Sequence, residues 1–335
     1  MYKFIYQLIL VSSFLILFSG CEKEELDLSN ARVEVVLSPE GVGDQGYNDK
    51  ILHGLQAASD KYGFVLAVHI PLEKEYAGEI YEEWLISTPD DGCERSLFIF
   101  SGSEYEYLLD SISRPEDPRK DILMFETDKA IDGIYTFNIG CYAAAYLAGA
   151  TSVMNSEGQE QKALVIAANP YEKNIKRAVD GYKDGYLAAG GDGCDVLYLS
   201  EEQDGGYHMQ DEAYRICNKN LGNYSFYYSV AGASNKGVYR FSRENVEFVV
   251  GMDGDMSIYG YIPVSVVKHI DKAIVQVMED LLSKRDIPYH LNFTYGSGYE
   301  EMIYAPWFSS DSFLDISDIK NNIAEIERKY EESNL

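Results

Sequence analysis

The chain has 335 residues, and its 55 acidic side chains outnumber 28 basic ones, for a formal net charge of −27. This negative charge repels the phosphates of nucleic acids and the anionic headgroups of lipids, so we expect neither as a direct partner. The five cysteines and five histidines show no CxxC pair and no zinc-ligand spacing, so the sequence supports neither a metal site nor a cofactor. A disulfide between Cys194 and Cys217 stays open, because spacing does not determine connectivity.

The first residues have the pattern of a cleaved secretory signal, which we assign to residues 1–20. Lys3 is followed by an apolar run from Leu8 to Phe18 that is shorter than the ~20 residues of a membrane-spanning helix. The ending "LFSGC" resembles a bacterial lipobox, although Phe18 replaces the usual aliphatic residue, and this resemblance implies that Cys21 is lipidated. We therefore expect a protein of the bacterial cell envelope, anchored by lipid and facing the periplasm or the cell surface.

The next segment, residues 21–32, is acidic and lacks apolar periodicity, which predicts a solvated tether between the lipid and the folded part. In the remainder of the chain, short apolar runs alternate with helical periodicity, a pattern typical of parallel sheets covered by helices on both faces. A helix is expected over residues 48–63, with Ile51, Leu55 and Ala58 on one face. The strands expected in the first half are Val33–Leu37, Phe64–Ile70, Ser96–Phe100 and Ile122–Phe125.

The second half repeats this plan. A long amphipathic helix is expected from Val264 to Leu281, where apolar residues recur at helical spacing. The pattern predicts an α/β fold with two lobes, each a mainly parallel sheet flanked by helices, joined by short hinges because no flexible linker separates them. The strands expected in the second half are Ala163–Ala168, Asp195–Ser200, Ser225–Val230 and Val246–Asp253. The N-terminal lobe is expected to comprise residues 33–136 and 262–288, and the C-terminal lobe residues 137–261 and 289–335.

The stretch "GVGDQGYNDK", residues 41–50, stands between the first expected strand and its helix. Ligands of open α/β sheets bind beyond the carboxyl ends of the strands, so such loops are the positions to inspect. Asp44, Tyr47 and Asn48 offer an acceptor, a flat ring and an amide that both donates and accepts. The same residues are also typical of an ordinary helix start, so both interpretations stay open.

Polar loops follow the later strands as well, among them "SGSEYEY", "ETDKAIDG", "ANPYEKN", "AGASNKG" and "DGDMSIYG". Five motifs also occur in this order along the chain: "GDQGYND", "FNIGCYAAAYLAG", "NPYEKNIKRAVDGYKDG", "SVAGASNKGV", and "VVGMDGDM" with "VSVVKHIDKAI". Together these segments resemble the basic membrane protein family of type I solute-binding lipoproteins, many of which bind nucleosides for ABC importers. The resemblance extends from about Val33 to Leu282 and implies the two-lobed fold of type I periplasmic binding proteins, with a ligand cleft between the lobes.

The resemblance also implies roles for matching residues. Tyr47 would stack on a nucleobase, while Asp44 and Asn48 would hydrogen-bond the base or the sugar. Asp253 and Lys268 would hold ribose hydroxyls from the opposite side, in agreement with the acceptor and donor character of these groups. We expect a monomer that captures a nucleoside, with purine nucleosides favoured, and presents it to an ABC permease. Further candidates, chosen at strand ends or in matching loops, are Phe100, Phe137, Asn138 and Gly232.

A binding protein without catalysis is expected, because the sequence has no G-x-S-x-G element, no Cys and His pairing and no phosphate loop with Lys and Ser/Thr. Two alternatives stay open. The lipoprotein can bind or sense sugars or other small molecules without a transporter, since a transporter partner leaves no motif on a binding protein. It can also be a glycosidase or nucleoside hydrolase that pairs two carboxylates, for example Asp44 and Asp253, as acid and base.

Replacing Cys21 with Ser is expected to move the protein from the membrane fraction to the soluble fraction, because a serine cannot carry the lipid that the lipobox-like ending implies. Cell fractionation with metabolic labelling by a radioactive fatty acid measures both properties. Cys93→Ser is the control and should leave acylation unchanged. A Cys21→Ser protein that stays in the membrane without acylation would contradict the lipid anchor.

Overall fold

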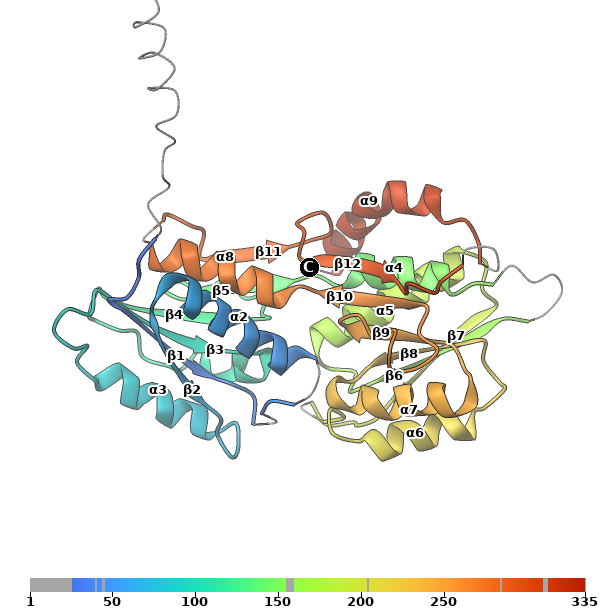
Figure 1. Ribbon diagram of the computed structural model, residues 1–335, viewed down its shortest axis with the longest axis horizontal. Coiled ribbons are helices and arrows are strands. Elements are labelled where there is room, and N and C mark those ends of the chain that lie inside the picture. The colour runs from blue at the N-terminus through green and yellow to red at the C-terminus, as the bar shows by residue number, and fades with distance from the viewer. Residues whose placement is uncertain are drawn as a thin grey trace, which may run out of the picture.

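The computed structural model describes residues 26–39, 41–43, 46–154, 160–203, 205–283, 285–309 and 313–334. The expected signal (residues 1–20), the lipidation site Cys21 and the ligand candidate Asp44 lie outside these described residues. Two six-stranded sheets with flanking helices form two lobes that lie side by side (Figure 1). The predicted two-lobed α/β fold is therefore confirmed. Within the described ranges, no helix combines the length and the apolar character needed to cross a membrane.

All paired strands of the first sheet run parallel, and the sheet separates two apolar cores. In order across the sheet, the strands are β11 (His290–Phe293), β5 (Tyr135–Ile139), β4 (Lys120–Phe125), β3 (Arg95–Phe100), β1 (Ala31–Val36) and β2 (Val65–His69). Helices α2 (Tyr47–Tyr62) and α8 (Ile270–Leu282) cover one face. Helix α3 (Tyr76–Ile86) and the short 3-10 helix η1 (Ser103–Leu108) cover the other. Parallel strands buried on both faces explain the unbroken apolar runs in the sequence.

The second sheet has the same construction, except that its edge strand β12 is antiparallel to its neighbour. In order, the strands are β12 (Glu300–Tyr304), β10 (Val264–Lys268), β9 (Val249–Asp253), β8 (Phe226–Val230), β6 (Lys162–Ala167) and β7 (Gly193–Tyr198). Helices α4 (Tyr142–Thr151) and α5 (Lys173–Ala188) pack on one face, and α6 (Gln210–Lys219) and α7 (Asn235–Asn245) on the other. The C-terminal helix α9 (Ser317–Asn334) packs outside α4.

The two cysteines whose pairing the sequence left open are both free thiols. Cys194 on β7 packs against the core under α4 and α5, whereas Cys217 on α6 belongs to the core on the opposite face of the sheet. The sheet between these two cores therefore keeps the thiols apart.

The chain passes between the lobes from β5 to α4, from β10 to α8 and from β11 to β12. The lobe ranges expected from the sequence differ from this arrangement. The range 262–288 is divided, because β10 pairs in the second sheet while α8 packs against α2 of the first lobe. Likewise β11, expected in the C-terminal lobe, pairs with β5 of the first sheet, and residues 137–139 belong to β5 itself.

The helix expected to begin at Val264 is wrong over its first turn. Residues 264–268 form β10, which lies between β9 and β12, and α8 begins only at Ile270. Every residue of β10 is buried, and Val264, Val266 and Val267 are β-branched. A β-branched run buried on both faces fits a central strand better than a helix, although the spacing of three residues between Val264 and Val267 also matches a helical face.

Helices α4 and α5 approach each other closely because glycines line their contact. A Cβ atom placed on Gly149 would lie 2.0 Å from the carbonyl oxygen of Tyr182. A Cβ on Gly185 would lie 1.9 Å from the carbonyl oxygen of Tyr146. Real side chains do not approach a backbone oxygen so closely, so these positions require glycine. The contact holds α5, and with it the loop that precedes α5, at the carboxyl end of β6.

We expect Gly185→Ala to lower the free energy of unfolding by about 1–3 kcal/mol, because the added methyl group forces α4 and α5 apart. Gly78→Ala is the matched control, since a Cβ at this position of α3 meets only Leu108 Cδ2 at an ordinary 3.6 Å. Its better helix propensity should raise stability by up to about 1 kcal/mol. Urea unfolding of both variants measures the difference, and equal stabilities would contradict the close-contact explanation.

Candidate ligand-binding cleft

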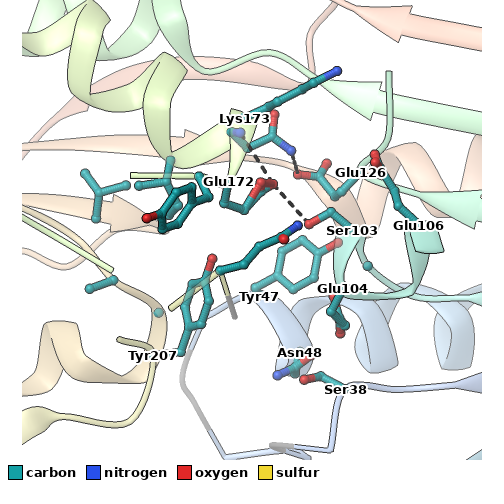
Figure 2. A pocket seen from close by; sticks show the side chains of 18 of the residues that line it. Ser38, Tyr47, Asn48, Ser103, Glu104, Glu106, Glu126, Glu172, Lys173 and Tyr207 are labelled. Carbon is teal, nitrogen blue, oxygen red and sulfur yellow. Dashed lines mark hydrogen bonds between the residues drawn. The ribbon is translucent and has the colours of Figure 1, made fainter. Parts of the chain in front are cut away.

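A cavity of about 510 Å³ lies between the lobes at the carboxyl ends of their parallel strands (Figure 2). Its size falls within the range typical of small-molecule sites, and its position is the one where open α/β sheets bind ligands. The first lobe contributes Ser38, Pro39, Tyr47, Asn48, Glu73, Lys74, Gly102, Ser103, Glu104, Glu106, Tyr107, Glu126 and Asp128. The second lobe and its hinge contribute Cys141, residues 171–175, Gln203, Tyr207, His208, residues 230–233, Met252, Asp253 and Lys268.

The cavity brings together five of the residues singled out in the sequence: Tyr47, Asn48, Gly232, Asp253 and Lys268. Tyr47 and Asn48 stand at the start of α2 in the first lobe, and the other three come from strand ends of the second. The Tyr47 hydroxyl donates to the carbonyl oxygen of Ser101 at 2.9 Å, which fixes the ring at the cavity wall. Burial and the surrounding carboxylates raise the pKa of Tyr47, so the ring stays neutral.

Three other candidates do not line the cavity. Phe100 is fully buried in the core under α3, where its ring lies 5.0 Å from that of Phe98. Phe137 packs against Phe125 at 4.7 Å between ring centroids in the opposite core of the same sheet. Phe100 ends β3, whereas Phe137 lies in the middle of β5, and alternation along each strand directs both rings into the cores. A strand-end position alone was therefore a poor guide to the cavity.

Asn138 also lies outside the cavity, although it supports one wall. Its side-chain amide donates to Asp128 Oδ1 at 2.8 Å, and Asp128 itself lines the cavity. The position of this asparagine on β5 thus orients a carboxylate that the sequence analysis missed.

A buried ion pair joins the two lobes at the base of the cavity. Glu126, which follows β4, accepts from the Lys268 ammonium at the end of β10, and both side chains are only 5% exposed. Burial opposes the charge on the lysine, but the surrounding negative groups, Glu126 first among them, together outweigh burial and raise the pKa of Lys268. Removing one partner of such a pair leaves an uncompensated buried charge, so each partner constrains the other. The pair therefore connects the two lobes at the base of the cavity.

Two cavity carboxylates lie on a strained backbone. Glu126 has a φ of 57° and Asp253 a φ of 70°, values in the left-handed region that residues other than glycine seldom adopt. Glu126 directly follows β4 in the first lobe, and Asp253 is the last residue of β9 in the second. Such conformations cost of order 1–3 kcal/mol and cluster at binding sites, where they direct a side chain. Here they turn two carboxylates toward the space between the lobes.

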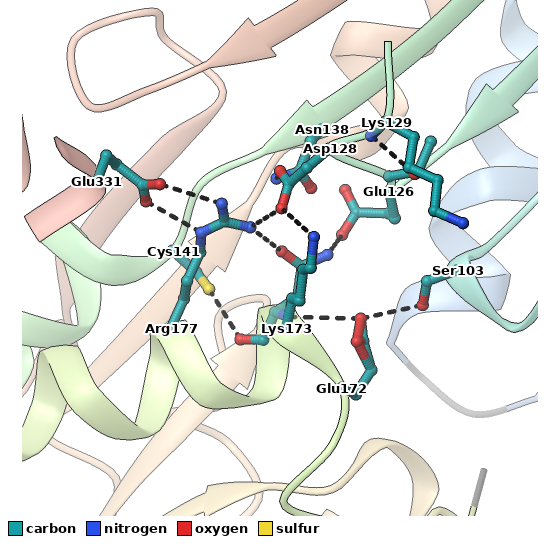
Figure 3. A network of polar contacts seen from close by, with 12 residues as sticks. Ser103, Glu126, Asp128, Lys129, Asn138, Cys141, Glu172, Lys173, Arg177 and Glu331 are labelled. Carbon is teal, nitrogen blue, oxygen red and sulfur yellow. Dashed lines mark hydrogen bonds and ion pairs between the residues drawn. The ribbon is translucent and has the colours of Figure 1, made fainter. Parts of the chain in front are cut away.

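Glu172 is a further acidic residue of the wall. Its carboxylate accepts from the Ser103 hydroxyl of the first lobe at 3.0 Å and from the backbone N–H of Asn174 at 3.4 Å (Figures 2 and 3). Burial raises the pKa of Glu172, so this carboxyl is more easily protonated than a solvated one. A carboxylate held in this way has acceptor capacity left for a ligand hydroxyl.

Lysines of both lobes bridge the rim. Lys50 of α2 donates to the carbonyl oxygens of Asp253 and, at 2.9 Å, of Lys268 in the second lobe. Lys236 of α7 donates to the carbonyl oxygen of Gly43 in the first lobe at 2.7 Å. These bonds join α2 to the ends of β9 and β10, and Gly43 to α7, across the two lobes. The cavity wall is thus assembled from both lobes rather than carried by one.

Among the residues that the sequence analysis missed, Glu126, Asp128, Ser103 and Glu172 lie in segments that follow strands, and Glu126 follows its strand directly. They belong to the loops "ETDKAIDG", "SGSEYEY" and "ANPYEKN", which the sequence marked only as segments to inspect. Their position after a buried run was the available signal, and no residue type distinguished them. Among the described residues, no three His, Cys, Asp or Glu side chains lie together as a metal ion would require.

Neither a family model nor a curated protein matches this chain, whereas solved structures do. A solute-binding protein of an ABC transporter system from Aeropyrum pernix K1 superposes with a TM-score of 0.67 at 19% identity, over 82% of this chain and 76% of that one. A transcriptional activator of the comK gene from Bacillus halodurans gives 0.66 at 18% identity, over 91% and 99%. An ABC transporter periplasmic solute-binding protein from Actinobacillus succinogenes 130z, with bound D-allose, gives 0.62 at 11% identity, over 82% and 97%. The chain shares the two-lobed α/β fold of these three proteins.

Proposed function

We propose that this protein is a solute-binding protein that captures a nucleoside in the cavity between its lobes, with purine nucleosides as the favoured ligands. The observation that carries the proposal is the composition of the wall, to which each lobe contributes a tyrosine and carboxylates. Tyr47 and Glu126 come from the first lobe and Tyr207 from the second (Figure 2). Asp253 is a carboxylate that the second lobe adds. Flat rings suit the faces of a base, and carboxylates suit the hydroxyls of a ribose.

Specific roles follow from this assignment. Tyr47 covers one face of the base, and Asn48 hydrogen-bonds its edge. Asp253 accepts from ribose hydroxyls, and Lys268 donates to them, since an ammonium has three donors and Glu126 accepts one of them. Asp44, which lies outside the described residues, belongs to the same proposal through its place in the loop before α2.

A free sugar is the second candidate ligand. Several carboxylates line the cavity, and the similar protein from Actinobacillus succinogenes holds D-allose. Carboxylates that accept from vicinal hydroxyls serve a monosaccharide as well as a ribose. The tyrosines from both lobes favour the nucleoside, because a base offers them two flat faces.

Binding without chemistry is part of the proposal. Cys141 lines the cavity, but burial raises the pKa of its thiol, and a protonated thiol is a weak nucleophile. Its Sγ donates instead to the carbonyl oxygen of Asn174 at 3.4 Å. Attachment through a lipid on Cys21 and delivery to an ABC permease complete the proposed function, as the lipobox-like ending and the similar ABC transporter proteins support.

We expect wild-type protein to bind adenosine, guanosine or inosine in calorimetric titration, and Tyr47→Ala and Asp253→Gly to bind them more weakly. Glycine is chosen at position 253 because it tolerates the positive φ there, so the loss reports on the carboxylate alone. Losing a hydrogen bond to a charged group should weaken binding roughly thirty- to hundredfold.

Asp255→Gly is the matched control, because Asp255 is exposed two residues further on and accepts from the backbone N–H of Ser257. It should bind like the wild type. Titrations with uridine, ribose, glucose and allose complete the series. If the protein binds sugars but no nucleoside, the proposed ligand is a sugar and not a nucleoside. If both cavity variants bind with wild-type affinity, the assignment of the binding site is rejected.

A further inference from the structure

The C-terminal helix α9 lies outside the cleft but is connected to it through one arginine (Figure 1, Figure 3). Glu331 of α9 accepts two hydrogen bonds from Arg177 of α5, from Nε and from Nη2, each at 3.0 Å. The remaining Nη1 of the same guanidinium lies 2.9 Å from Asp128 Oδ2, across the boundary between the lobes. One arginine thus links a helix of the second lobe to a cavity residue of the first.

Helix α9 is held in place independently of this arginine. The ring of Tyr330 stacks on that of Tyr142 in α4, with 3.8 Å between centroids and 14° between planes. The Tyr330 hydroxyl donates to Asp180 of α5 at 2.8 Å, and Ile323 is buried against α4. Glu331 follows Tyr330 directly, so these contacts place its carboxylate beside Arg177.

The arginine also reaches the cavity by a second route within its own lobe. Its Nη1 donates to Asn174 Oδ1 at 3.3 Å, and the Asn174 amide donates to Glu126 Oε2 of the first lobe at 3.2 Å. Asp128, Asn174 and Glu126 all line the cavity. The side chains of Arg177, Asp128 and Glu331 are only 11%, 17% and 18% exposed, so solvent screens their interactions weakly.

We propose that Arg177 is a positioning residue that latches the two lobes together, and that α9 sets the strength of this latch through Glu331. The part of the proposal that concerns ligand retention rests on the proposed solute-binding function. Arg177 and Glu331 belong to the same lobe, so their fork-like pairing persists when the lobes separate, whereas the contact with Asp128 breaks. Glu331 therefore orients the guanidinium before closure and lowers the entropy that closure costs.

Arginine suits this role because its planar fork presents five donors in a fixed geometry. Nε and Nη2 are occupied by Glu331, which leaves Nη1 directed at Asp128 and Asn174. A lysine at the same position carries the charge but cannot contact both carboxylates in one orientation. The latch should therefore depend on guanidinium geometry and on charge together.

The test combines two measurements on the folded, full-length chain. Small-angle X-ray scattering without ligand reports the separation of the lobes, and stopped-flow release of adenosine reports retention. We expect Arg177→Met to increase the radius of gyration and to raise the dissociation rate about thirtyfold, with the association rate changed much less. Glu331→Gln keeps the shape but loses the charge, and should raise the dissociation rate by roughly fivefold.

Two variants away from the latch are the controls. Arg215→Met removes an arginine that pairs with Glu212 within α6, and Glu332→Gln removes a carboxylate that pairs with Arg328 within α9. Both should behave like the wild type. Glu331→Gln added to Arg177→Met should have no further effect, because Glu331 acts through Arg177. If Arg177→Met does not fold, Arg177→Lys replaces it and should likewise lose the dependence on Glu331.

Unchanged scattering and release in the Arg177 variants would overturn the latch. The latch would also be overturned if Glu331→Gln raised the dissociation rate just as much in the Arg177→Met variant. That result would show that α9 acts on stability and not through Arg177. If the wild type binds none of adenosine, guanosine and inosine, the nucleoside assignment fails, and the scattering of ligand-free variants still decides whether Arg177 holds the lobes together.

Discussion

The ion pair of Glu126 and Lys268 is the interaction on which the arrangement of the cleft depends. The two side chains belong to different lobes, and each is only 5% exposed, so little water is available to replace the partner. Two buried charges of opposite sign must meet, because either one alone in the interior is costly. Their pairing defines how β4 of one sheet faces β10 of the other, and the remaining cavity residues are arranged around this point.

Further contacts between the lobes surround the ion pair on several sides. Lys50 binds the carbonyl oxygens that end β9 and β10, and Ser103 donates to Glu172 across the cavity. Arg177 contacts Asp128 on the side that faces α9. These groups are polar, and water can replace most of them when the lobes separate. An interface of this kind suits hinged lobes, whereas a large apolar contact would hold them permanently closed.

The hinge side of the molecule is built more rigidly than the rim. Glycines let α4 and α5 pack backbone to backbone, and the stacked rings of Tyr142 and Tyr330 attach α9 to this pair. The loop that carries Glu172 and Asn174 leads directly into α5, so the second lobe presents these side chains from a fixed platform. Rigid elements behind a polar rim place the cavity groups accurately while the rim contacts form and break.

The sequence by itself determined the two α/β lobes, because unbroken apolar runs with helical periodicity between them have few other stable arrangements. It also singled out Tyr47, Asn48, Gly232, Asp253 and Lys268, which line the cavity, from polar loops after strands and from a family resemblance. Tertiary structure alone decided that Phe100 and Phe137 face the cores, that Val264 begins a strand, and that Glu126 meets Lys268. These outcomes depend on which neighbour lies across a sheet or across the cleft, and residues such as Glu126 and Lys268, 142 positions apart, meet only once both lobes have folded.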